Sequence, residues 1–238
     1  MKKVNLFFIK SLIMALVCFF IISCDESGPE IPVYDMLPVS KYERDETTTL
    51  IFHDDKKITE YNVYNGKSLD ENDLKYKAGV IYKTGSIHCT LDGINYMIQL
   101  DNTIGGSRVR ELSASIGSAL YYKVIYFYDD QGRLSGTEVN VAHEGGNIYY
   151  TKYEYNESSI KIMDDGIYEI QLGDEENTGH IFNVLGHSEA PLTSKYVFNP
   201  ELYFLNIYGK PVGKLPLGTT IMRSTNSMRI GQYYYEYK

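Results

Sequence analysis

The chain has 238 residues, of which 43% are hydrophobic and 23% are charged. This composition excludes disordered, collagen-like and coiled-coil proteins, and 3 cysteines are too few for a disulfide scaffold. The net charge of −8 argues against a broad nucleic-acid interface, which needs a basic surface. Tyrosine is frequent, with 23 Tyr against 9 Phe and no Trp, and such amphipathic rings suit the half-exposed faces of β-sheets.

Residues 1–23 have the pattern of a secretory signal peptide. Lys2 and Lys3 precede an uncharged apolar run over residues 11–22, which is shorter than the roughly 20 residues of a transmembrane helix. The run ends in Ile-Ile-Ser followed by Cys24, which resembles the lipobox of bacterial lipoproteins. The resemblance implies cleavage before Cys24 and lipidation of its thiol and its new amine. Each buried CH₂ of such a lipid contributes about 0.8 kcal/mol, so two or three acyl chains hold a domain on a bilayer.

Residues 24–40 form the lipidated cysteine and a Pro- and Gly-containing flexible tether. Asp25 and Glu26 resemble the acidic export signal of Bacteroides-type surface lipoproteins, which implies a lipid anchor in the outer membrane and display on the cell surface. The alternative location is the periplasmic face. Cleavage also removes three lysines, which leaves 20 basic against 31 acidic residues and a net charge of −11. Anionic lipid surfaces would repel such a domain, so its membrane partner is expected to hold it only through the lipid on Cys24.

Residues 41–238 are predicted to form one all-β domain. Apolar and polar residues alternate with a period of two, and Asp, Asn and Gly separate the runs, as in antiparallel hairpins. We expect a single antiparallel meander that forms a strongly curved sheet or a partly closed barrel. The predicted strands are 47–53, 58–65, 76–83, 86–91, 94–101, 107–115, 120–128, 133–142, 147–156, 159–163, 166–172 and 229–237.

A short helix is predicted over residues 200–208, between the two last predicted strands. Asn199 would be its N-cap, Pro200 its first residue, and Gly209 its end.

Three segments together resemble a family of Bacteroides-type lipoproteins of uncharacterised function with a porin-like β-fold. They are the Tyr-Asp-x-x-Gly-Arg-Leu unit at residues 128–134, the Tyr-Glu-Tyr-Asn strand at residues 153–156, and the stretch from Asn199 to Lys210 with Leu215 and Pro216. The resemblance covers roughly residues 45–238 and implies the fold, with no catalytic residues to carry over. A pore is not expected, because charged residues interleave along the strands and leave no continuous apolar outer band.

The sequence predicts no cofactor, metal site or catalytic residue. The five histidines lack metal-ligand spacing, and three acidic pairs, at 54–55, 129–130 and 164–165, lie at predicted turns. Cys89 is expected to be a small buried apolar residue.

The tyrosine surplus indicates binding. Tyr149, Tyr153 and Tyr155 share one face of a predicted strand and are the candidate binding face for a glycan or a protein partner. The function expected is thus a non-catalytic binding or structural module of the cell envelope. Two alternatives remain open: an envelope hydrolase whose site is assembled from distant residues, and a periplasmic lipid or assembly carrier with an apolar cradle.

Overall fold

The computed structural model describes residues 41–232, apart from residues 45, 55–56, 104–105, 165, 178–193, 198 and 224–225. The predicted signal peptide, Cys24 and the tether lie outside the described residues. So do His180, His187 and the last residues of the strand predicted at 229–237.

Fourteen strands form one sheet in the described part of the chain, and their order in the sheet is their order in the sequence. Each strand pairs antiparallel with the next, so the fold is a continuous meander. The strands are β1 (Lys41–Arg44), β2 (Thr47–Asp54), β3 (Lys57–Asn65), β4 (Leu74–Lys83), β5 (Ser86–Leu91), β6 (Ile94–Thr103), β7 (Gly106–Ile116), β8 (Ala119–Tyr128), β9 (Leu134–Val141), β10 (Asn147–Tyr155), β11 (Ser159–Met163), β12 (Ile167–Glu176), β13 (Lys214–Arg223) and β14 (Asn226–Gln232).

Helical structure is short in the described residues. It consists of the 3₁₀ turns η1 (Glu71–Asp73) and η2 (Ala142–Glu144) and of the helices α2 (Ser194–Val197) and α3 (Pro200–Tyr203). The predicted helix at 200–208 therefore begins as expected, with the Asn199 side chain accepting a hydrogen bond from the Leu202 amide, but ends after one turn. Asn206 has a positive φ of 55°, which a continuing α-helix does not allow.

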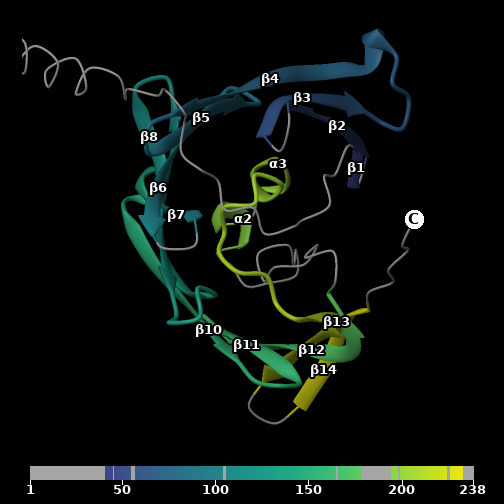
Figure 1. Ribbon diagram of the computed structural model, residues 1–238, viewed down its shortest axis with the longest axis vertical. Helices are drawn as coiled ribbons and strands as arrows, with labels where there is room; N and C mark the ends of the chain where they lie inside the picture. The colour runs from purple at the N-terminus through teal and green to yellow at the C-terminus, as the bar shows by residue number, and fades with distance from the viewer. Residues whose placement is uncertain are drawn as a thin grey trace, which may run out of the picture.

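The sheet curves strongly, and α2 and α3 lie on its concave side (Figure 1). Within the described residues β1 and β14 are the two edge strands of the sheet, and they do not pair with each other. The prediction of an all-β, strongly curved antiparallel meander is thus confirmed.

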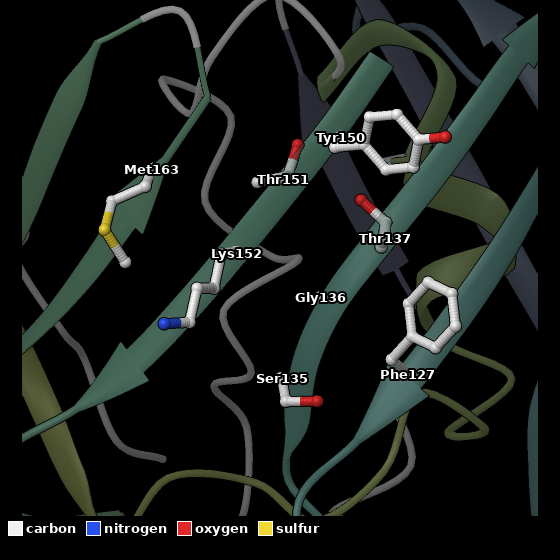
Figure 2. A pocket seen from close by; sticks show the side chains of 8 residues that line it. All are labelled: Phe127, Ser135, Gly136, Thr137, Tyr150, Thr151, Lys152 and Met163. Carbon is white, nitrogen blue, oxygen red and sulfur yellow. The ribbon is translucent and has the colours of Figure 1, made fainter. Parts of the chain in front are cut away.

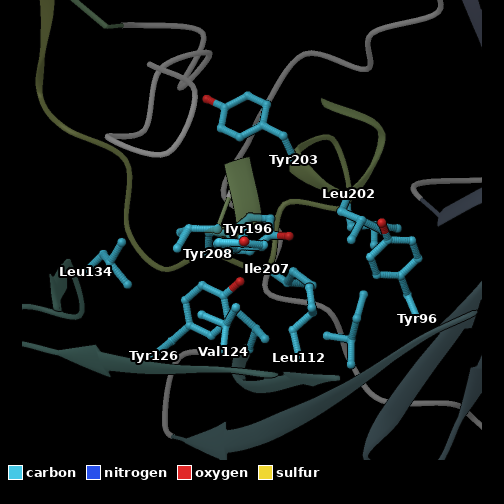
Figure 3. Close-up of a cluster of buried hydrophobic side chains, with 14 of the residues drawn as sticks. Tyr96, Leu112, Val124, Tyr126, Leu134, Tyr196, Leu202, Tyr203, Ile207 and Tyr208 are labelled. Carbon is cyan, nitrogen blue, oxygen red and sulfur yellow. The ribbon is translucent and has the colours of Figure 1, made fainter. Parts of the chain in front are cut away.

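The hydrophobic core lies between the concave face of the sheet and residues 199–210, which contain α3 and are called the α3 segment below. Cross-strand neighbours supply the sheet side of this core; one such row is Ile87, Ile98, Leu112, Val124 and Val139. Leu202 and Ile207 pack onto the sheet from the other side and are both 0% exposed (Figure 3). Burial of each such side chain contributes about 1.5–3 kcal/mol, so the α3 segment is an integral part of the fold.

Hydrogen bonds join the α3 segment to two strands and to one hairpin turn. The Val109 amide donates to Ile207 O at 2.7 Å, and the Lys210 amide donates to Gly132 O at 2.8 Å. The Tyr61 hydroxyl donates to Glu201 O at 2.6 Å. Residues at both ends of the α3 segment are therefore tied to β3, to β7 and to the β8–β9 hairpin.

Candidate binding groove

The three tyrosines predicted as a binding face lie on the concave side of the sheet. They do share one face of β10 with Thr151, as strand alternation requires. Tyr153 is 6% exposed and belongs to the core, while Tyr149 and Tyr155 are half-buried against it. The burial of Tyr153 argues against an exposed platform made of these three rings, because a partner does not reach a side chain packed in the core.

Tyr155 and Tyr149 also make bonds that hold the fold together. The Tyr155 hydroxyl donates to Leu134 O at 2.6 Å, and the guanidinium of Arg133 stacks 4.3 Å from the ring centroid. The Tyr149 hydroxyl donates to Glu144 Oε2 at 3.3 Å. Burial is the largest cause that raises the pKa of Tyr155, so its hydroxyl stays protonated and keeps its donor role.

The carboxylate of Glu144 links the sheet to α2. It accepts a hydrogen bond from the Tyr196 hydroxyl at 2.7 Å as well as the one from Tyr149. The neighbouring His143 ring stacks on Tyr121 with 3.9 Å between ring centroids. Because Tyr196 is buried, this cluster supports the docking of α2.

The Tyr-Asp-x-x-Gly-Arg-Leu unit forms the hairpin between β8 and β9. Asp129 accepts hydrogen bonds from the amides of Gln131 and Arg133, and it forms an ion pair with the Arg133 guanidinium at 2.8 Å. Burial alone would raise the pKa of Asp129, but the hydrogen bonds and the positive charge from Arg133 outweigh it and lower the pKa. Gly132 has a positive φ of 80°, as the turn requires. The acidic residue therefore has the turn role that the sequence predicts.

Titratable groups do not converge on a metal site in the described residues, which hold no group of three His, Cys, Asp or Glu side chains placed to bind an ion. Asp55 and Asp165, from two of the acidic pairs, lie outside these residues. Cys89 is 5% exposed, and burial, assisted by the charge of Glu201, raises the pKa of its thiol to about 12.

An open groove lies on the convex face, across β8, β9, β10 and β11 (Figure 2). Its volume is about 360 Å³, and its lining includes Phe127, Ser135, Gly136, Tyr150, Lys152 and Met163. Four of these residues are direct cross-strand neighbours, in the order Phe127, Gly136, Lys152 and Met163. The groove therefore follows one row across the sheet, in which Gly136 has no side chain and is itself buried.

Close packing of the main chain explains the glycine at position 136. A Cβ on this residue would stand 2.9 Å from the main-chain oxygen of Thr151, closer than real Cβ atoms approach backbone, and 3.8 Å from Cδ2 of Phe127. No larger residue therefore fits here without a shift of the strands. The β-bulge between Phe127 and Tyr128 lies beside it and interrupts the regular pairing of β8 with β9.

Two aromatic rings border the groove and are open to solvent. Tyr150 is 62% exposed and Phe127 is 46% exposed. The alternation along β10 predicts that Lys152 and Glu154 lie on the face opposite Tyr149, Tyr153 and Tyr155, and Tyr150 lies on the same face as Lys152 and Glu154. Adjacent tyrosines at 149 and 150 were the signal that could have found it, because adjacent strand residues point to opposite faces.

No described helix has the length and apolar composition needed to cross a membrane.

No known protein-family model matches the chain, and no curated protein sequence matches it. Among solved structures, a porin-like protein from Bacteroides uniformis ATCC 8492 is similar, with a TM-score of 0.57 and 15% sequence identity. The similarity covers 79% of this chain and 78% of that chain. At this identity the likeness shows the fold, and it supports the porin-like fold that the sequence resemblance implies.

Proposed function

We propose that the protein is a lipid-anchored lipoprotein of the cell envelope that acts as a non-catalytic binding module for a glycan or protein partner. Its anchor is the lipidated Cys24, and its location is the outer membrane with the domain on the cell surface. The signal-peptide pattern and the Cys24 motif support the anchor, and Asp25 and Glu26 support surface display.

The observation that supports the binding role is the difference between the two faces of the sheet: one packs against the core, and the other carries a groove with exposed aromatic rings. On the concave face the chain's own α3 segment packs onto the sheet, with Leu202, Ile207 and Tyr208 all buried there. The convex face carries the groove with exposed Phe127 and Tyr150. Among the residues that the structure describes, exposed aromatic rings beside a groove, typical of recognition surfaces, therefore support a binding module better than an apolar lipid cradle.

The structural neighbour supports the envelope location. That protein is described as porin-like, and porins are outer-membrane proteins.

Metabolic labelling with palmitate in the native host tests the anchor. The protein is expected to incorporate label, Cys24→Ala is expected to lose it, and the matched control Cys18→Ala, within the signal peptide, is expected to retain it. Protease added to intact cells then tests surface display. Digestion on intact cells is the expected result; protection until the outer membrane is opened would place the domain in the periplasm, and label retained by Cys24→Ala would refute the anchor.

A further inference from the structure

We propose that the convex groove around Gly136 is a stacking subsite for the sugar rings of a neutral glycan. This inference rests on the proposed binding function and names the ligand class and the site.

The first argument is the pair of exposed aromatic side chains at the groove. Phe127 comes from β8 and Tyr150 from β10, with Gly136 of β9 between the two strands (Figure 2). The face of an aromatic ring carries partial negative charge, and the C–H groups on the flat side of a pyranose carry partial positive charge. Sugar rings therefore stack on such side chains, and the exposed rings offer this contact without any movement of the core.

The second argument is the floor of the groove. Gly136 offers main chain in place of a side chain, and the ring of Phe127 lies beside it, 3.8 Å from the position of an added Cβ. Gly136 is itself buried, so the surface that a ligand meets here is the exposed ring of Phe127 and not the main chain. A sugar ring would therefore stack on Phe127 at this point of the groove.

The third argument is the polar lining. The hydroxyls of Ser135 and Tyr150 can both donate and accept hydrogen bonds, and Lys152 Nζ donates to Glu154 Oε1 at 2.7 Å. Sugar hydroxyls also donate and accept, so a mixed aromatic and hydroxyl lining matches them. An apolar helix is a poorer match, because Glu138 and Asn140 face the same side next to the groove.

Charge selects a neutral glycan. The positive charge of Lys152 is matched by Glu154, and Glu138 is the direct cross-strand neighbour of Tyr150. The protein that the proposed cleavage leaves has 20 basic and 31 acidic residues and a net charge of −11, which disfavours sugars that carry sulfate, phosphate or carboxylate groups.

The test is binding of the full protein, purified in detergent from its host, to arrays of neutral and anionic oligosaccharides. Isothermal titration then gives the Kd for the best neutral oligosaccharide. Phe127→Ala and Tyr150→Ala are each expected to weaken binding by about tenfold or more, since each removes a stacking ring. The matched control is Ile81→Ala, because Ile81 is 59% exposed on the distant strand β4 and does not line the groove. Circular dichroism confirms that each variant is folded.

Each outcome decides the proposal. Binding of a neutral glycan that both groove variants weaken and Ile81→Ala leaves unchanged supports it. Binding that Phe127→Ala and Tyr150→Ala leave unchanged would refute the site while keeping the binding function. Selective binding of anionic sugars would refute the neutral ligand class. Binding of no glycan would refute this inference, and the palmitate and protease experiments would still test the lipid anchor and the surface location independently.

Discussion

Replacing Gly209 with alanine tests how closely the chain after α3 is seated on the β8–β9 hairpin. Gly209 has a positive φ of 85°, and an added Cβ would stand 2.6 Å from Cε1 of Tyr128 and 2.7 Å from Gly132 O. The second of these atoms is main chain, and it already accepts the hydrogen bond from the Lys210 amide at 2.8 Å. The methyl group can be accommodated only if the segment moves away from the hairpin.

Two effects add up in the expected loss of stability. A left-handed conformation costs an L-residue roughly 1–2 kcal/mol, and overpacking in a tight site costs about 1–3 kcal/mol more. Gly209→Ala should therefore lower the free energy of unfolding by about 2–5 kcal/mol. Gly145→Ala is the matched control, since Gly145 has a φ of 80° and an added Cβ there would meet nothing within 4 Å. It should show the first effect alone.

Urea unfolding followed by far-UV circular dichroism gives both free energies under the same conditions. The expected result is a loss in Gly209→Ala that exceeds the loss in Gly145→Ala by at least about 1 kcal/mol. Equal losses in the two variants would refute the close approach of the α3 segment to Tyr128.

Three further predictions concern buried and paired groups. Asp129→Ala should destabilise the fold at pH 7 by about 1–3 kcal/mol, and the exposed Asp130→Ala much less. Folding lowers the pKa of Asp129 from its ordinary value of 3.8, so its contribution to stability is complete above pH 3.8 and is lost as the pH falls through the lower pKa of the folded state. The difference between wild type and Asp129→Ala in urea unfolding should therefore shrink in strong acid. A difference that does not depend on pH would contradict this. Tyr61→Phe should lower the free energy of unfolding by about 1 kcal/mol, because the Tyr61 hydroxyl donates a hydrogen bond to Glu201 O. Tyr126→Phe should leave it nearly unchanged, since the Tyr126 hydroxyl has no hydrogen-bond partner in the described part of the chain. Equal losses of the two variants in urea unfolding would contradict this reasoning. The thiol of Cys89, with its pKa raised to about 12, should resist maleimide at pH 8 in the native protein and react in urea, and rapid native labelling would show that the site opens.

The strands were predictable where the period of two is strong and undisturbed. The predicted strand at 94–101 corresponds to β6, and the one at 147–156 to β10. β13 was missed because Pro216 and Gly218 interrupt its pattern, and the structure accommodates them through shifts in the register with β12. β1 was missed because four residues give too short a pattern to recognise.

The candidate site was predictable only in part. Alternation along β10 separates its residues into two faces, but it does not say which face another segment covers. Here the face with Tyr153 belongs to the core, to which the α3 segment, distant in sequence, also contributes, and Tyr150 on the other face is left in solvent. An isolated glycine in the middle of a predicted strand can indicate a close approach of main chain, and Gly136 provides one.

Two tyrosines of the sheet, Tyr128 and Tyr155, have a role that phenylalanine could not fill. Tyr128 donates to Val109 O at 2.7 Å and Tyr155 donates to Leu134 O at 2.6 Å; both acceptors lie beside a β-bulge, where the regular ladder is interrupted. In each case the arginine before the acceptor, Arg108 or Arg133, stacks 4.3 Å from the centre of the tyrosine ring.

A strongly bent sheet needs such bulges, and each bulge disturbs the pairing of main-chain carbonyls near it. Tyrosine supplies the apolar area of phenylalanine together with a donor for such a carbonyl, so it suits this concave face better. Tyr150 differs from the other tyrosines of β10, because its ring is 62% exposed and borders the convex groove, where the proposed sugar ring would stack.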